Sequence, residues 1–548
     1  MTSPYRPSPT QREVIEDESP VLVVLGSAGT GKTVTAVAAA IHHLVRQEGA
    51  AHAGRQQSVH TPCPQRALFL SFSRTAVAQI VDRATAISKA STERLEVSTF
   101  DGFAWRVLND FGRFRNLPRP LRVISAADAK VPGGEPGFLY RELLPAAAEI
   151  LAVPAVARHY EERYGLVVCD EFQDTSDSEW SFLGLIAPLA RRILLADTNQ
   201  CIYAELKGID PEARITGAIR LPHARVIELP PASYRDPSGV LPAAAAAAMQ
   251  RRFTDQAIGV AVRQERLHVL RSSTTSAYQK AAELVRQARS SSQTVSVFTH
   301  TNEATANLSD AFLAARIAHE QVGLTEASGE AVNAQLALLR DALTGSETGR
   351  RAVAVYITAT TRGSSAPPFA MQILQGHNPA FERRFGQVNT ELKDAADCDP
   401  WDVGVLGQLI KGAFGRFGTL RGQETWLQAA SRFRTLLQSV ESGGDLAALE
   451  RIANRLRHGI LVGHAPTRNH AVQVMNLHQT KGREADVTIL VLQSDEFHGY
   501  EREPFVRGSR LLYVVMTRAR KVANIIVPGD VHPLWQPLVT ACETFELT

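Results

Sequence analysis

A glycine-rich stretch near the N-terminus constrains this chain more than any other feature. Gly26-Ser-Ala-Gly-Thr-Gly-Lys32-Thr33 fits the pattern G-x-x-x-x-G-K-[ST], and the apolar run Val21–Leu25 before it predicts a buried strand of a parallel sheet. Glycine lets the backbone turn its amide N–H groups toward phosphate oxygens. We expect Lys32 to neutralise the β- and γ-phosphates and the Thr33 hydroxyl to hold Mg²⁺. The stretch therefore predicts a nucleoside triphosphate site, for ATP or GTP.

Two adjacent acids follow a second apolar run. Asp170 and Glu171 come directly after Leu166–Cys169, at the carboxyl end of an expected parallel strand, and open α/β sheets bind ligands at that edge. We expect Asp170 to hold Mg²⁺ and Glu171 to orient or deprotonate an attacking water. Alone, the pair is better explained by a solvated loop. Together with the phosphate loop it predicts nucleotide hydrolysis.

Short apolar runs alternate with helical patterns along most of the chain. This alternation predicts the α/β fold class, with parallel sheets in two domains that each carry a mostly helical insertion. We expect the first domain at 1–104 and 163–240, its insertion at 105–162, the second domain at 241–345 and 465–548, and its insertion at 346–464.

Composition narrows the cellular setting. The 548 residues carry a net charge of only +3, which by itself does not indicate a nucleic-acid partner, although a binding groove needs only local basic charge. The five cysteines are scattered without a Cys-x-x-Cys pair, which predicts neither a disulfide framework nor a zinc site and favours a cytoplasmic compartment. No apolar run approaches the ~18 residues of a membrane span, so we expect no membrane partner.

Motifs along the chain resemble those of a known family. Asp170-Glu-Phe-Gln-Asp-Thr175 resembles motif II of the UvrD/Rep-like superfamily 1 DNA helicases, and further segments resemble the other motifs of that family in its order. The resemblance covers about 1–130, 160–345 and 465–530. It implies two RecA-like P-loop domains with ATP and Mg²⁺ between them, a short 1B-like first insertion and a reduced 2B-like second insertion.

The resemblance also implies residues that contact the nucleotide. In chain order they are Gln11 for the adenine edge, Gly26, Ser27, Ala28, Gly29, Thr30, Gly31, Lys32 and Thr33 for the phosphates, Gln200 for sensing the γ-phosphate, Tyr234 for stacking on adenine, Arg235 and Arg518 as arginine fingers, and Glu484 for the ribose. The two arginines would reach the γ-phosphate only when the domains close, so hydrolysis would release the closed state.

A second implied set would contact the DNA strand. It comprises Phe72, on which a base would stack, with Arg74, Thr99, Tyr203 and His478. Packing in the core explains Phe72 equally well, and the same holds for Phe100.

The chain departs from the family after Tyr203. The family usually has an aromatic residue and an arginine there that touch single-stranded DNA, whereas this chain reads Ala204-Glu-Leu-Lys207. Stacking of one base on an aromatic side chain contributes ~1–3 kcal/mol. We therefore expect a weaker hold on the strand than in the family.

These observations together predict an ATP-dependent DNA translocase or helicase that moves 3′ to 5′ on single-stranded or tailed DNA, in repair, recombination or defence. The alternative is a DNA-stimulated ATPase subunit that regulates a partner nuclease, or another repair or defence protein, without strong unwinding of its own. The altered segment after Tyr203 and the short insertions favour the alternative, whereas the complete set of hydrolysis motifs favours translocation.

The altered segment generates a prediction. Leu206→Trp should increase the duplex length unwound in a single turnover more than it increases ATP hydrolysis, because a new stacking platform resists backward slippage. Single-turnover unwinding at fixed salt, compared with the wild type, measures this. Wild-type unwinding of duplexes many turns long would contradict it.

Overall fold

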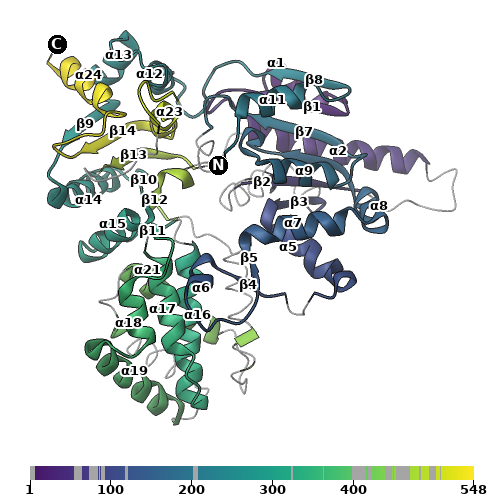
Figure 1. Ribbon diagram of the computed structural model, residues 1–548. Helices are drawn as coiled ribbons and strands as arrows, with labels where there is room; N and C mark the ends of the chain where they lie inside the picture. The colour runs from purple at the N-terminus through teal and green to yellow at the C-terminus, as the bar shows by residue number, and fades with distance from the viewer. Residues whose placement is uncertain are drawn as a thin grey trace.

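The computed structural model contains two six-stranded sheets and a separate group of packed helices (Figure 1). It describes residues 6–54, 65–72, 80, 84–85, 87, 93–117, 121–201, 208–322, 325–361, 363–397, 415–417, 422–438, 447, 450–451, 470–480, 483–492, 501–506 and 508–547. Every strand pair recorded in these residues is parallel. The predicted α/β fold class is confirmed.

The first sheet is built from the N-terminal part of the chain. Its strand order is β3 (Leu95–Thr99), β2 (Arg66–Ser71), β6 (Tyr164–Cys169), β7 (Arg191–Ala196), β1 (Val21–Leu25) and β8 (Ala224–Glu228). Helices α1 (Pro9–Glu16) and α2 (Lys32–Gly54) cover one face, and α5 (Phe100–Phe111), α7 (Tyr140–Leu151), α8 (Pro154–Arg163), α9 (Asp177–Leu185) and α11 (Pro211–Ile219) cover the other.

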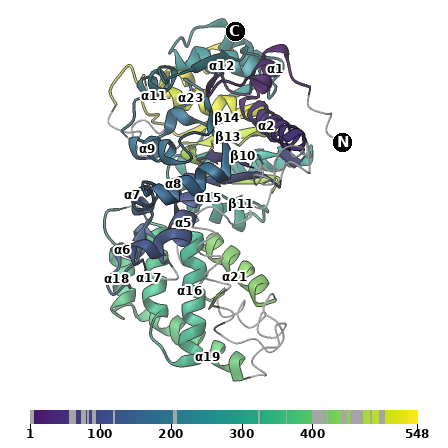
Figure 2. The same ribbon diagram turned by 90° about the vertical axis from the view of Figure 1, so that its right-hand side faces the viewer.

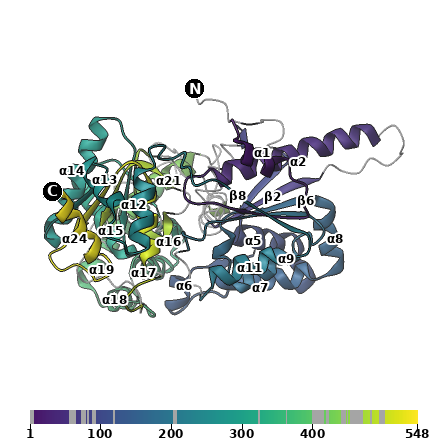
Figure 3. The ribbon, with the colours of Figure 1, turned by 90° about the horizontal axis from the view of Figure 1, so that it is seen from above.

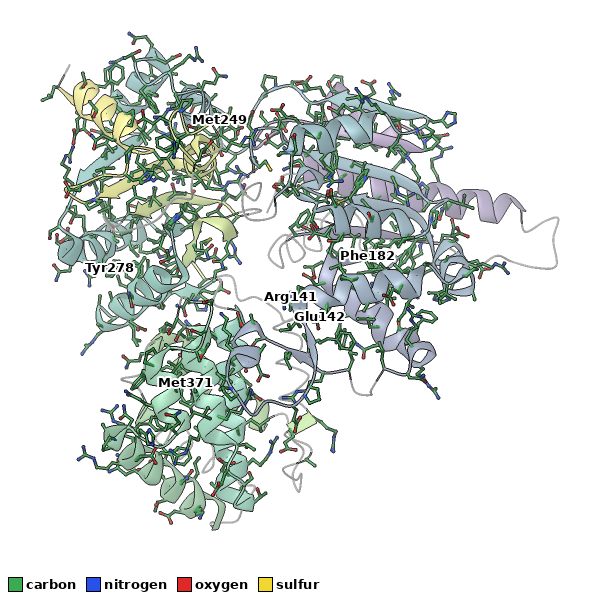
Figure 4. All side chains as sticks on the ribbon, in the orientation of Figure 1. Arg141, Glu142, Phe182, Met249, Tyr278 and Met371 are labelled. Atoms are coloured by element: carbon green, nitrogen blue, oxygen red, sulfur yellow. The ribbon has the colours of Figure 1, made fainter. Side chains whose placement is uncertain are left out.

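Burial on both faces explains the continuous apolar runs of these strands. Leu22 and Val24 pack into the core under α1 and α2, while Val23 points into the opposite core. Phe182 on α9 is fully buried in that second core (Figure 4). The inner strands β1, β6 and β7 therefore contain continuous apolar runs, whereas the edge strands β3 and β8 also carry charged residues.

The second sheet collects strands from both sides of a long interruption. Its order is β11 (Glu320–Gln321), β12 (Val472–Asn476), β10 (Val295–Thr299), β13 (Ala485–Val491), β14 (Ala519–Val527) and β9 (Leu267–Arg271). Helices α12 (Val240–Met249), α13 (Gln256–Arg263), α23 (Ser509–Thr517) and α24 (Gln536–Glu546) cover one face, and α14 (Thr274–Ser290) and α15 (Asn302–Ala314) cover the other. Seen from above, the two α/β parts lie side by side (Figure 3).

The helical part lies between β11 and β12 in the chain. It contains α16 (Thr325–Thr344), α17 (Gly349–Ala359), α18 (Pro368–Leu374), α19 (Pro379–Asp397) and α21 (Gln423–Gln438). Helix α16 shares one hydrophobic core with the four later helices, although it precedes the boundary expected at 345/346. The boundary expected at 104/105 likewise falls inside α5. The pattern of strands alone does not show to which domain the apolar faces of α16 and α5 belong.

Residues 123–139 of the first insertion contact the helical part. Strands β4 (Val123–Ile124) and β5 (Phe138–Leu139) pair with each other and flank α6 (Ala126–Lys130), which lies against α17 (Figure 2). Ala127 and Val131 are members of the same hydrophobic core as α16 and α17. The Arg351 guanidinium donates to Asp128 Oδ1 at 2.6 Å and to the carbonyl of Val131 at 2.9 Å. The two insertions therefore touch through a buried polar and apolar contact.

This contact generates a stability prediction. Arg351→Met should weaken the docking of α6 by about 3 kcal/mol, because Asp128 stays buried without its closest counter-charge. Hydrogen exchange of the amides of residues 126–131 should accelerate about a hundredfold. Lys130→Ala is the matched control, since it removes an exposed bond to the Gly363 carbonyl and leaves the pair of Arg351 with Asp128 in place. Unchanged exchange in Arg351→Met would contradict the prediction.

Candidate functional site

Three adjacent strands of the first sheet place the candidate site. Strands β6, β7 and β1 are neighbours, and their carboxyl ends lead into Asp170, Asp197 and Gly26. Because all three strands are parallel, these residues meet at one edge of the sheet. The second sheet contributes Glu484 and Arg518, which immediately precede its neighbouring strands β13 and β14.

The loop between β1 and α2 requires glycine at two positions. Gly29 and Gly31 have φ values of 81° and 85°, in the left-handed region that side chains with a Cβ disfavour. A Cβ on Gly31 would lie 2.9 Å from Gln11 Nε2, and one on Gly29 would collide with Ser233 Oγ. The loop is therefore a tight backbone cradle of the kind that binds phosphate.

Lys32 lies inside this cradle. Its ammonium donates to the carbonyls of Gly26 at 2.6 Å and Ser27 at 3.0 Å, and lies 3.4 Å from Asp197 Oδ2. The residue is only 8% exposed. A cation held at this place by neutral carbonyls and one carboxylate suits the charge of a bound triphosphate.

Thr33 and Asp170 form a pair of oxygen donors beside the cradle. Thr33 Oγ1 donates to Asp170 Oδ2 at 3.1 Å. Burial, followed by the charge of Glu171, raises the pKa of Asp170 to about 6, against the opposing effect of Lys32. No group of three or more His, Cys, Asp or Glu side chains in the described part of the chain could hold a metal by itself. The pair therefore fits Mg²⁺, which keeps water and phosphate oxygens as its remaining ligands.

Glu171 is held in a fixed orientation next to this pair. Its backbone is left-handed, with φ of 53°, and Gln173 Nε2 donates to Glu171 Oε2 at 2.6 Å. Gln173 in turn accepts from the backbone N–H of Asp197 at 3.2 Å. The carboxylate that sequence reasoning assigns to water activation is thus tied to the end of β7.

Gln200 connects the two α/β parts. Its Nε2 donates to Asp197 Oδ2 at 2.7 Å, and its Oε1 accepts a hydrogen bond from the Arg518 guanidinium. Both Gln200 and Arg518 are nearly fully buried. The amide therefore lies between a carboxylate of the first part and a cation of the second.

Arg518 retains an unused donor. Within the described residues its buried Nε has no hydrogen-bond partner. Burial, with a further contribution from Arg235, lowers the pKa of Arg518 to about 10, so the guanidinium is still charged at neutral pH. A buried, charged N–H without an acceptor is costly, and a phosphate oxygen would satisfy it.

Arg235 and Glu484 form an ion pair with each other. Arg235 Nε donates to Glu484 Oε2 at 2.8 Å, and its NH1 group donates to the Thr517 carbonyl at 2.6 Å. Burial opposes ionisation of Glu484, but Arg235 and Arg520 outweigh it and lower its pKa to about 2. The roles predicted for these two residues, one on the γ-phosphate and one on the ribose, stay predictions.

Gln11 and Tyr234 flank the glycine loop. Gln11 accepts from the Ser8 backbone N–H at 2.9 Å and donates to the Thr30 carbonyl at 3.2 Å, so its amide supports both α1 and the loop. Tyr234 is 60% exposed, while its backbone N–H donates to the Gly29 carbonyl at 2.8 Å. Both residues adjoin the cradle, and an exposed ring beside it can stack on a base. Their predicted adenine contacts remain untested.

Of the residues predicted to contact DNA, the structure describes the side chains of Phe72 and Thr99. The rings of Phe72 and Phe100 lie 5.3 Å apart, and Phe100 is buried in the same core as Phe182. The Thr99 hydroxyl accepts from the Gly102 N–H at 3.0 Å as the N-cap of α5. Arg74, Tyr203, the segment 204–207 and the His478 side chain lie outside the described residues. The DNA contacts therefore stay predictions.

Sequence reasoning missed several members of the site. Asp197 pairs with Lys32, Gln173 fixes Glu171, and Arg520 donates to Glu484. Tyr513 Oη accepts a hydrogen bond from the Ala28 N–H at 3.1 Å, across the interface of the two parts. Tyr513 lies five residues before Arg518 in the same motif, but nothing in the sequence distinguishes it from a core tyrosine.

Comparison with known proteins agrees with this geometry. Residues 8–132 and 137–209 match the family model of the UvrD/REP helicase N-terminal domain. The chain carries a UvrD/REP helicase N-terminal domain.

The similar proteins include DNA helicase II of Escherichia coli (strain K12) and of Salmonella typhimurium, each 24% identical over 295 residues, which cover 43% of this chain and 39% of the relative. The chain thus matches about two fifths of the length of these relatives. One subunit of the ATP-dependent helicase/nuclease of Streptococcus sanguinis is 35% identical over 79 residues, 14% of this chain and 6% of that protein.

The UvrD/REP domain match includes the glycine loop, the acids after β6 and Gln200. Arg235, Glu484 and Arg518 lie outside it, so their place in the site rests on the contacts described above. No helix among the described residues is long and apolar enough to cross a membrane.

The position of Arg518 generates a kinetic prediction. Arg518→Ala should lower kcat for ATP by ~10³-fold or more while changing KM little, because arginine fingers act mainly on the transition state. Arg510→Ala, on the helix that ends just before Arg518 and 3.8 Å from an exposed Glu212, is the matched control. Steady-state kinetics of both variants provide the measurement, and an effect of Arg518→Ala on KM alone would contradict the prediction.

Proposed function

We propose that this chain is an ATP-driven motor on single-stranded DNA, which hydrolyses ATP between its two α/β parts and moves 3′ to 5′. The contact of Arg518 with Gln200 carries the proposal. It places a charged donor from the second part beside the phosphate loop of the first. Hydrolysis would then depend on how the two parts sit against each other, which is what a motor requires.

The residues divide the work at the triphosphate. Lys32 and the loop amides hold the phosphates, and Thr33 with Asp170 would hold Mg²⁺, which supplies neutralisation of phosphate charge when bound. Glu171, fixed by Gln173, orients and deprotonates the attacking water. Arg518 directs its free Nε–H to the γ-phosphate.

Arg235 completes the set by a change of partner. When the ribose hydroxyls bind the Glu484 carboxylate, the ion pair between Arg235 and Glu484 breaks. The Arg235 guanidinium then reaches the γ-phosphate. Gln11 and Tyr234 would bind the adenine, the ring by stacking and the amide through its edge. This arrangement favours ATP over GTP.

Loss of the γ-phosphate would remove the acceptor of Arg518. The two parts would then lose one of the interactions that join them, which leaves the Gln200, Tyr513 and Arg235 contacts, and the interface would open. Opening and closing would shift the grip on a strand that runs across both parts. The electrostatic share of that grip should weaken with salt.

We propose the same organisation of domains as the sequence predicts, with one adjustment. The two RecA-like domains are the parts around the two sheets, and the 2B-like insertion starts at Thr325, because α16 shares its core. Action in the cytoplasm in DNA repair, recombination or defence is part of the proposal, and the DNA helicase II relatives support DNA as the substrate.

One comparison favours the second candidate function. The similarity to a helicase/nuclease component supports a DNA-stimulated ATPase that regulates a partner nuclease. Strand displacement on duplexes with 3′ tails, 5′ tails or no tail separates the two candidates. Displacement restricted to 3′-tailed duplexes supports the motor. ATP hydrolysis stimulated by single-stranded DNA without displacement supports the regulatory ATPase, and hydrolysis indifferent to DNA contradicts both.

The role of Glu171 generates a further prediction. Glu171→Gln should bind ATP normally but lower its turnover by ~10²–10⁴-fold, because the shape and the contact with Gln173 are kept while the base is lost. Lys32→Ala is the contrasting variant, which should lose ATP binding itself. Equilibrium binding and turnover of both proteins provide the measurement, and near-normal turnover in Glu171→Gln would overturn the assignment.

A further inference from the structure

A hydrogen bond joins the second part of the chain to the phosphate loop itself. The backbone N–H of Ala28, in the middle of the loop, donates to Tyr513 Oη at 3.1 Å. Ala28 is 4% exposed and Tyr513 is 3% exposed, so water does not substitute for this partner. The phenol therefore takes a loop amide of the kind that otherwise serves phosphate.

The phenol oxygen of Tyr513 is a hydrogen-bond acceptor that a phosphate oxygen can replace. Burial, followed by the negative charge of Asp197, raises the pKa of Tyr513, so it stays neutral at physiological pH. A neutral phenol oxygen is a weaker acceptor than a charged phosphate oxygen. A triphosphate in the loop would compete successfully for the Ala28 N–H, and the Tyr513 O–H would remain able to donate.

One helix links this contact to Arg518. Tyr513 lies on α23, which ends at Thr517, and Arg518 follows directly. The contacts of this segment with the first part include one with Ala28 through Tyr513 and one with Gln200 through Arg518. A change at the first contact displaces a rigid element that carries the second.

We propose that Tyr513 is a positioning residue. Its phenol oxygen accepts the hydrogen bond of the Ala28 N–H until a phosphate oxygen replaces it, and Tyr513 sets the position of Arg518 through α23. This inference rests on the proposed ATP hydrolysis and deepens it. It assigns to Tyr513 the coupling between filling of the loop and placement of the arginine.

Tyr513→Phe tests the proposal, because it removes the phenol oxygen and little else. The Ala28 N–H is then buried without its acceptor, a cost that bound phosphate relieves, so the variant should bind a fluorescent ATP analogue about tenfold more tightly. Its kcat should fall about tenfold, because Arg518 loses its coupled placement. Tighter binding with slower turnover is a combination that simple loss of packing does not produce.

Tyr356→Phe is the matched control. It removes a buried phenol whose O–H donates to the Gly422 carbonyl at 2.7 Å in the helical part, away from the loop. Its nucleotide affinity and kcat should equal those of the wild type. Unchanged affinity and kcat in Tyr513→Phe, in a wild type that hydrolyses ATP, would overturn the inference alone, whereas a wild type without ATP hydrolysis would overturn the proposed function.

A measurement on the wild-type sequence covers the case in which Tyr513→Phe does not fold. With 3-fluorotyrosine at position 513, the fluorine resonance should shift on addition of a non-hydrolysable ATP analogue and stay in place on addition of AMP. The same response to both nucleotides, or to neither, would contradict a phosphate-dependent contact.

Discussion

The buried hydrogen bond between Arg518 and Gln200 is the interaction on which the candidate site depends. An arginine removed from water is tolerated only where acceptors surround it, and here one acceptor comes from the other α/β part. Gln200 is itself fixed by Asp197, which also pairs with Lys32. The cation of the second part is therefore connected, through one amide and one carboxylate, to the cation of the phosphate loop.

The arrangement of strands makes this network possible. Parallel neighbours β6, β7 and β1 bring Asp170, Asp197 and Gly26 to one edge without any need for long loops. The second sheet presents the starts of β13 and β14 to that edge, with Glu484 and Arg518 just before them. The two sheets thus supply complementary halves of the candidate site.

The local parts of this arrangement could be predicted from sequence, because they depend on neighbouring residues. The glycine loop, its preceding strand and the acids after Leu166–Cys169 all lie where the patterns indicate. Contacts between distant segments could not be predicted in the same way. The pairing of Arg235 with Glu484 and the use of the Thr99 hydroxyl as a helix cap depend on packing that no local pattern encodes. The position of α16 in the helical core has the same origin.

The central claim is that a triphosphate in the loop engages residues of both α/β parts. A structure of the chain with Mg²⁺ and a non-hydrolysable ATP analogue tests it most directly. We expect the Lys32 ammonium to move from the Gly26 and Ser27 carbonyls to phosphate oxygens, and the Arg518 Nε to lie within hydrogen-bond distance of the γ-phosphate. A nucleotide bound only by the first part, with Arg518 Nε far from any phosphate oxygen, would contradict the claim.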